Sequence, residues 1–149
     1  MATPEGSAEE KSKTTTNAVR ILVVDDELDL LLALSGTLRR AGYVVRTAHS
    51  AERGLTLLEQ EAADVVITDV IMPRKSGIDV IGKVRELYPT TRVIAMSGGG
   101  NFGLSGYRAD AITTSAYLLV SESAGAHAVL AKPFEASEIL AVVRQVLGA

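Results

Sequence analysis

The sequence predicts an α/β fold in which a doubly wound parallel sheet carries helices on both faces. Short apolar runs of strand length, rich in β-branched residues, alternate with longer amphipathic stretches. This alternation is typical of parallel strands joined by crossover helices. The runs are apolar at nearly every position, as expected for strands that are covered on both sides. We expect strands at residues 21–24, 43–47, 65–68, 92–96 and 128–131, of which the last has the weakest pattern.

The stretches between these runs have helical periodicity and clear end signals. Basic residues and a glycine end the first stretch, a serine N-cap begins the second, and a proline follows the third. A further helix is expected between the fourth and fifth strands. The apolar stripes lie at residues 28–38, 55–58, 78–87 and 139–147, and the end signals are Arg39, Arg40 and Gly42, then Ser50, then Pro89.

Length and composition indicate one domain that buries a sizeable core, since 47% of the 149 residues are hydrophobic. Residues 1–18 carry almost no large apolar side chain, so we expect a disordered leader before a domain at residues 19–149. The absence of cysteine excludes disulfides, thiolate metal sites and cysteine nucleophiles, and it suits a cytoplasmic protein. A net charge of −3 without a basic stripe gives no support for nucleic-acid binding. No apolar run approaches the roughly 18 residues of a membrane span.

Polar side chains stand where four of the predicted strands end. Asp25 and Asp26 follow the first strand, Asp69 the third, Ser97 the fourth and Lys132 the fifth. The carboxyl ends of strands in a doubly wound sheet line the crevice at the topological switch point. We therefore expect three carboxylates, a hydroxyl and an ammonium group to converge on one small pocket.

Three neighbouring carboxylates require compensation. Two unit charges about 4 Å apart repel by roughly 4 kcal/mol at an effective dielectric of about 20, so one carboxyl is protonated or a cation lies among them. Oxygen ligands without histidine or cysteine favour Mg²⁺, with Mn²⁺ as the alternative. A carboxylate held beside a metal and a lysine can also accept a phosphoryl group as a nucleophile. The cation, Lys132 and Ser97 would then stabilise the transferring oxygens.

Each feature also has a simpler interpretation by itself. A pair of aspartates after a strand is often an N-cap, Asp69 alone could open a turn, and Glu27 is expected to complement a helix dipole. The glycine-rich residues 98–103 lack the spacing of phosphate-binding loops, so we expect them to supply backbone freedom beside Ser97. The four strand ends taken together favour the phosphoryl-acceptor site.

With these segments the chain resembles a response-regulator receiver domain, the phospho-acceptor module of two-component signalling. The resemblance covers residues 19–149. It implies a five-stranded sheet of flavodoxin-like order 2-1-3-4-5. The length of residues 98–127 adds the expectation of an extended connection between the fourth and fifth strands. It rests on four motifs, one at each of the strand ends: VVDDE, ITDVIMPRKSG, IAMSGGG and AKPF.

The resemblance also implies a role for each site residue. Asp69 would be the phosphorylated aspartate, sharing Mg²⁺ with Asp25, Asp26 and the main-chain carbonyl of Ile71. Ser97 would be the switch hydroxyl that follows the phosphate. Lys132 would pair with the phosphate and precede a cis bond to Pro133. Pro73 and Gly77 would occupy the family's loop positions after the acceptor.

As a receiver, the chain would be a stand-alone signalling module that catalyses only its own aspartyl phosphorylation and dephosphorylation. Its donor would be a histidine kinase or a histidine phosphotransfer protein, with no direct contact with nucleic acid or a membrane. It would be a monomer, or a weak dimer through the fourth helix, fifth strand and fifth helix.

Two alternatives remain open. One is a Mg²⁺-dependent phosphohydrolase of the haloacid-dehalogenase type with Asp25 as nucleophile, although that family has an aspartate where this chain has Glu27. The other is a degenerate receiver that acts as a binding scaffold.

Two features depart from the usual receiver pattern. Val129 stands three residues before the lysine, where the family usually has an aromatic side chain whose rotation reports activation. Tyr107 and Tyr117 are the candidates to replace it. Residues 98–127 also exceed the roughly 20–24 that a typical helix and two loops require. We expect this surplus to determine the choice of partner.

Overall fold

In the computed structural model, which describes residues 18–70, 77–97 and 122–148, five strands form one parallel sheet. Their order is β2-β1-β3-β4-β5 and every neighbouring pair is parallel, as predicted. Each predicted strand bound is right to within one residue. The strands are β1 (Arg20–Val24), β2 (Val44–Ala48), β3 (Val65–Asp69), β4 (Arg92–Ser97) and β5 (Ala128–Ala131).

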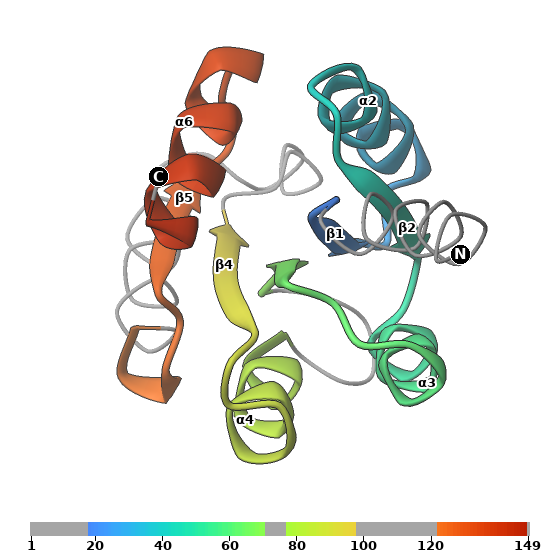
Figure 1. Cartoon of the computed structure of the whole chain (residues 1–149), viewed down its shortest axis with the longest axis vertical. Coiled ribbons are helices and arrows are strands. Elements are labelled where there is room, and N and C mark those ends of the chain that lie inside the picture. The colour runs from blue at the N-terminus through green and yellow to red at the C-terminus, as the bar shows by residue number, and fades with distance from the viewer. Residues whose placement is uncertain (1–17, 71–76, 98–121, 149) are drawn as a thin grey trace, which may run out of the picture.

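Helices cover both faces of this sheet. Figure 1 shows α2 and α6 on one face and α3 and α4 on the other. A helical turn at residues 122–124 precedes β5, and the rest of the helix predicted there falls at residues 98–121, outside the described part of the chain. None of the described helices has the length and apolar character needed to cross a membrane. The helices are α2 (Leu28–Arg40), α3 (Ala51–Gln60), α4 (Gly77–Leu87) and α6 (Ala136–Leu147).

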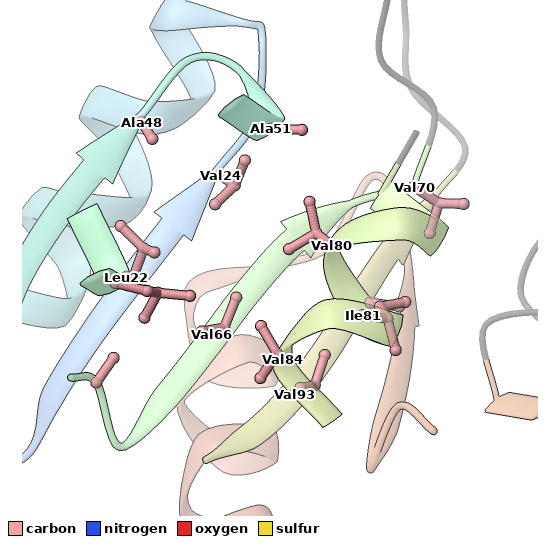
Figure 2. Close-up of a cluster of buried hydrophobic side chains, with 13 residues drawn as sticks. Leu22, Val24, Ala48, Ala51, Val66, Val70, Val80, Ile81, Val84 and Val93 are labelled. Carbon is pink, nitrogen blue, oxygen red and sulfur yellow. The ribbon is translucent and has the colours of Figure 1, made fainter. Parts of the chain in front are cut away.

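Alternation along the strands divides the core into two clusters, because successive side chains of a strand point to opposite faces. Figure 2 shows the cluster beneath α3 and α4, in which one set of alternating strand residues meets the apolar side of α4. The other set packs against α2 and α6. The first cluster includes Leu22, Val24, Val66, Val93, Val80, Ile81 and Val84; the second includes Ile21, Val23, Ile67, Ile94, Met96, Leu34, Leu38, Ile139 and Val143.

The helix ends follow the sequence signals. The Ser50 hydroxyl accepts a hydrogen bond from the Arg53 main-chain N–H at 3.1 Å, which confirms the predicted N-cap of α3. Helix α2 ends at Arg40, and Gly42 follows with a φ of 100°, in the left-handed region that glycine tolerates. The leucine stripe of α2 is only partly buried, because Leu28 and Leu32 are 61% and 71% exposed.

Gly77 begins α4 in direct contact with the end of β3. Its N–H donates to the carbonyl oxygen of Val70 at 2.8 Å. A Cβ atom at this position would overlap the main-chain carbonyl oxygen of Asp69. The helix can therefore approach this strand end only where the residue has no side chain.

We predict that Gly77→Ala lowers the free energy of unfolding by about 1–3 kcal/mol, because the added methyl group forces the main chain of α4 away from β3. Gly82, exposed in the same helix, is the matched control, since nothing lies within 4 Å of a Cβ built there. Gly82→Ala should leave stability unchanged or raise it by about 0.5–1 kcal/mol. Urea denaturation followed by circular dichroism measures both, and equal stabilities would contradict the close contact at Gly77.

Candidate functional site

Hydrogen bonds between neighbouring strands align the polar residues at the carboxyl edge of the sheet. Main-chain hydrogen bonds continue across the strand ends, from Asp25 N to Ala48 O at 3.0 Å and from Lys132 N to Ser97 O at 2.6 Å. Strands β3 and β4 each extend one residue further than predicted, so Asp69 and Ser97 are their last residues. Both side chains are therefore held by regular strand backbone.

Three carboxylates meet at this edge. Asp25, Asp26 and Asp69 each offer an oxygen atom, and these atoms all lie within 4.8 Å of one another. Asp25 and Asp69 are buried, with relative exposures of 0% and 4%. The convergence expected from the sequence is therefore found for these three residues.

Lys132 supplies the positive charge of the site. Its Nζ lies 2.9 Å from Asp25 Oδ2, 3.5 Å from Asp69 Oδ1 and 3.5 Å from Glu27 Oε1. Its side chain is only 7% exposed, so these contacts are poorly screened by water. The bond to Pro133 is cis, as the resemblance implied.

Ser97 brings a hydroxyl group to the same edge. The residue is fully buried, and its Oγ has no hydrogen-bond partner among the residues that the structure describes. Asp26 Oδ1 is also a buried atom without a hydrogen-bond partner among the described residues. Buried polar atoms are normally paired, so these two oxygen atoms at the carboxyl edge of the sheet are available to a ligand.

Asp25 and Asp26 are not the N-cap of α2. Glu27 occupies that position, and its main-chain N–H donates to Asp25 Oδ1 at 2.9 Å. Both carboxylate oxygens of Asp25 are thus engaged, one by Glu27 and the other by Lys132. The interpretation of the aspartate pair as a simple helix cap is wrong.

Burial and mutual repulsion shift the acid–base equilibria of the cluster. Burial raises the pKa of Asp69 to about 7; Lys132 opposes this rise, and the Asp25 and Asp26 carboxylates add to it. Burial and the charge of Asp25 likewise raise the pKa of Asp26. Burial alone would lower the pKa of Lys132, but Asp69 and Asp25 outweigh it and the pKa rises. One ammonium group therefore leaves the cluster short of positive charge.

The residues fit a hard divalent cation. The donor set consists of oxygen atoms, one of which is the unpaired Asp26 Oδ1, and three carboxylates share it with one lysine. The cluster could therefore bind a metal ion. Ile71, whose carbonyl was expected to complete the ligands, lies outside the described residues, as does Pro73.

Five other side chains differ in what the structure shows of them. Val129 is partly buried and packs against the cluster beneath α3 and α4, as an ordinary core residue. Tyr107 and Tyr117 lie outside the described residues. His127 does not contribute to the site: its Nδ1 accepts a hydrogen bond from Val93 N at 3.0 Å, just before β5. Glu27 was expected only to complement the helix dipole, and its contact with Lys132 was missed.

The comparison with known families agrees with this architecture. The response regulator receiver domain model matches residues 21–144, and the chain belongs to this family. Such receiver domains are phospho-accepting modules of two-component signalling and interact with histidine kinases. The chain is therefore a signalling module.

Individual relatives show the same relationship. FleR of Pseudomonas aeruginosa is 35% identical over 88% of this chain and 25% of its own length. NtrC of Azospirillum brasilense is 31% identical over 89% of this chain and 25% of its own length. CpxR of Escherichia coli is 30% identical over 86% of this chain and 49% of its own length. The chain thus spans between a quarter and about half of these curated relatives.

A solved structure matches over nearly the whole of its own chain. The chemotaxis response regulator CheY4 of Vibrio cholerae superposes with a TM-score of 0.73 at 26% identity, covering 87% of this chain and 99% of that one. The α/β fold and strand order are therefore those of the receiver family.

We predict that Asp69→Asn stabilises the metal-free chain at about pH 8, by on the order of 1–3 kcal/mol. The folded-state pKa of Asp69 lies above its ordinary value of 3.8. The wild type therefore loses stability as the pH rises from about 4 through about 7, whereas asparagine has no proton to lose. Lys132 keeps Asp25 as a partner in the variant.

Denaturation in the presence of EDTA, repeated between about pH 4 and about pH 8, measures this difference. The advantage of Asp69→Asn should shrink as the pH falls, because the wild-type carboxyl is then protonated. A variant that is less stable than the wild type at about pH 8 would contradict the electrostatic description of the cluster.

Proposed function

We propose that Asp69 accepts a phosphoryl group from the phosphohistidine of a histidine kinase or histidine phosphotransfer protein. In this proposal Asp25, Asp26 and Asp69, with the main-chain carbonyl of Ile71, hold Mg²⁺, for which Mn²⁺ can substitute. The observation that carries the proposal is the position of Asp69, whose Oδ1 lies 3.5 Å from Lys132 Nζ in a desolvated acidic cluster.

Asp25 is a poorer nucleophile than Asp69, which argues against the haloacid-dehalogenase alternative. Its side chain is fully buried, and both of its oxygen atoms already accept hydrogen bonds. An attacking oxygen atom there would first have to break its contact with Lys132 or with the Glu27 N–H. Glu27 also stands where that family has its second aspartate. The membership of the receiver family points the same way.

The transfer needs little covalent chemistry from the protein beyond the nucleophile. A carboxylate oxygen of Asp69 attacks phosphorus, so a P–O bond forms while the P–N bond of the donor breaks and the imidazole nitrogen keeps the electron pair. Lys132 and the unpaired Ser97 hydroxyl then donate to phosphoryl oxygens. Mg²⁺, when bound, would offset negative charge on the same oxygens. Loss of the phosphoryl group to water would restore the carboxylate.

The presence of the whole set of groups argues against a degenerate receiver that serves only as a scaffold. An unpaired carboxylate oxygen and an unpaired hydroxyl are costly to retain without a ligand, because unpaired buried polar atoms destabilise the fold. Asp26 Oδ1 and Ser97 Oγ are both unpaired among the described residues. In the phosphorylated state with Mg²⁺ bound, the Asp26 oxygen would bind the metal and the Ser97 hydroxyl would donate to a phosphoryl oxygen.

We predict that a small phosphodonor such as acetyl phosphate, with Mg²⁺, adds one phosphoryl group to the wild type and none to Asp69→Asn. The reason is that asparagine cannot form the acyl phosphate. Asp25→Asn should still be modified at Asp69, at a rate lowered at least about tenfold because Mg²⁺ binds less well. Mass spectrometry of the intact chain and of its peptides gives both the extent and the position.

Modification at Asp25 instead of Asp69 would favour the phosphohydrolase, and no modification in any variant would favour the scaffold. EDTA serves as the control for the metal, and should abolish the reaction of the wild type. Phosphorylation that is equally fast in EDTA would contradict the assigned role of Mg²⁺.

The proposal also covers the cellular location and the oligomeric state of the chain. We propose a cytoplasmic setting, in keeping with the lack of cysteine, and a receiver domain that is a monomer or weak dimer. The dimer face would combine β5 and α6 with the segment at residues 98–121, which lies outside the described part of the chain. Gel filtration of the phosphorylated sample tests this, and a dimer that is unaffected by changes in β5 or α6 would exclude the face.

A further inference from the structure

The carboxylate of Glu27 contacts Lys132 instead of capping its own helix. Glu27 is the N-cap of α2, but its side chain makes no capping hydrogen bond. Its Oε1 lies 3.5 Å from Lys132 Nζ, across 105 positions of sequence. Ser50 does the opposite at the start of α3, where its hydroxyl accepts from Arg53 N. The side chain of Glu27 therefore joins the start of α2 to the residue that follows β5.

Lys132 has as many carboxylate neighbours as it has N–H donors. An ammonium group has three donors, and the carboxylates within 4 Å in the described chain are those of Asp25, Glu27 and Asp69. Its hydrogen bonds go to Asp25 and Glu27, and Asp69 lies at ion-pair distance. A phosphoryl oxygen on Asp69 would therefore compete with these carboxylates for the same ammonium group.

Glu27 is the contact that is least costly to release. Its side chain is 35% exposed, whereas those of Asp25 and Asp69 are 0% and 6% exposed. Water can solvate the Glu27 carboxylate once it has left Lys132. Releasing Asp25 would leave a fully buried charge without its partner, which is strongly destabilising.

We propose that Glu27 is a positioning residue that holds the Lys132 ammonium in place until a phosphoryl group arrives, and then gives up its contact to a phosphoryl oxygen. This inference rests on the proposed function of Asp69 and Lys132.

The position of Glu27 has opposite consequences for anions and cations. Its carboxylate competes with a phosphoryl oxygen for Lys132 and repels it, so it weakens the binding of anions. The same negative charge attracts a cation to the acidic cluster. The negative charge of Glu27 acts on both the lysine and the acidic cluster, since it helps to raise the pKa of Lys132 and of Asp26.

The test is Glu27→Gln, which removes the charge and keeps the length of the side chain. Beryllofluoride binding at saturating Mg²⁺ should tighten by about two- to fivefold, the size expected for the loss of one partly exposed ion pair. The dissociation constant for Mg²⁺ alone should rise by a similar factor. Isothermal titration calorimetry of the full 149-residue chain measures both.

Asp29→Asn is the matched control. It removes one negative charge from the first turn of the same helix, at an exposed residue whose carboxylate is not among those within 4 Å of Lys132. Both affinities should stay at their wild-type values. A general change of surface charge would instead affect the two variants alike.

Opposite shifts in Glu27→Gln, with Asp29→Asn unchanged, would support the inference. No shift, equal shifts in the two variants, or weaker binding of both ligands by Glu27→Gln would overturn it, and the last result would indicate a purely structural role. A wild type that binds neither Mg²⁺ nor beryllofluoride would overturn the proposed function itself, so the two failures are distinguishable.

Discussion

The contact between one buried ammonium group and several carboxylates is the interaction on which the site depends. Lys132 lies within 3.5 Å of Asp25, Asp69 and Glu27, and only the first of these distances is as short as 2.9 Å. One positive charge cannot neutralise four neighbouring acidic side chains, and burial, with a smaller contribution from the Asp25 and Asp26 charges, raises the pKa of Asp69 to about 7. The metal-free site is therefore strained electrostatically, and this strain favours the binding of a cation.

Parallel strand topology is what creates that strain. The strand ends of β1, β3 and β5 bring together residues that lie far apart in the sequence, and the main-chain ladder leaves their side chains little freedom to separate. Gly77 adds to the confinement, because α4 begins against the carbonyl of Asp69. The confined carboxylates therefore lower the stability of the metal-free chain as the pH rises.

Most of the fold could be predicted from the sequence because its strands are buried on both faces. Residues 65–67, for example, are apolar on both sides of the strand, and all of them are buried in β3. The convergence of Asp25, Asp69 and Lys132 followed from the same reasoning, because parallel strands end at a common edge. Local end signals such as Ser50 were equally informative, since an N-cap acts within a few residues.

What the sequence could not predict depends on contacts between distant elements. Periodicity marks Leu28 and Leu32 as part of an apolar stripe, but whether they are covered depends on neighbouring elements, and both are exposed. Glu27 occupies an N-cap position where a charge complementing the helix dipole is an adequate explanation, and only the position of Lys132 shows its other role. The same holds for His127, whose bond to Val93 N exists only because β4 and β5 are neighbours.

The central claim is that the strand ends form one phosphoryl-binding site around Asp69. A crystal structure of the chain with Mg²⁺ and beryllofluoride, a mimic of the phosphoryl group, tests it most directly. We expect beryllofluoride to be bonded to an Asp69 carboxylate oxygen, with Lys132 Nζ and Ser97 Oγ as its protein contacts and Mg²⁺ held by the aspartates. Beryllofluoride bound at Asp25, or a site left empty at saturating concentrations of both ligands, would contradict the account.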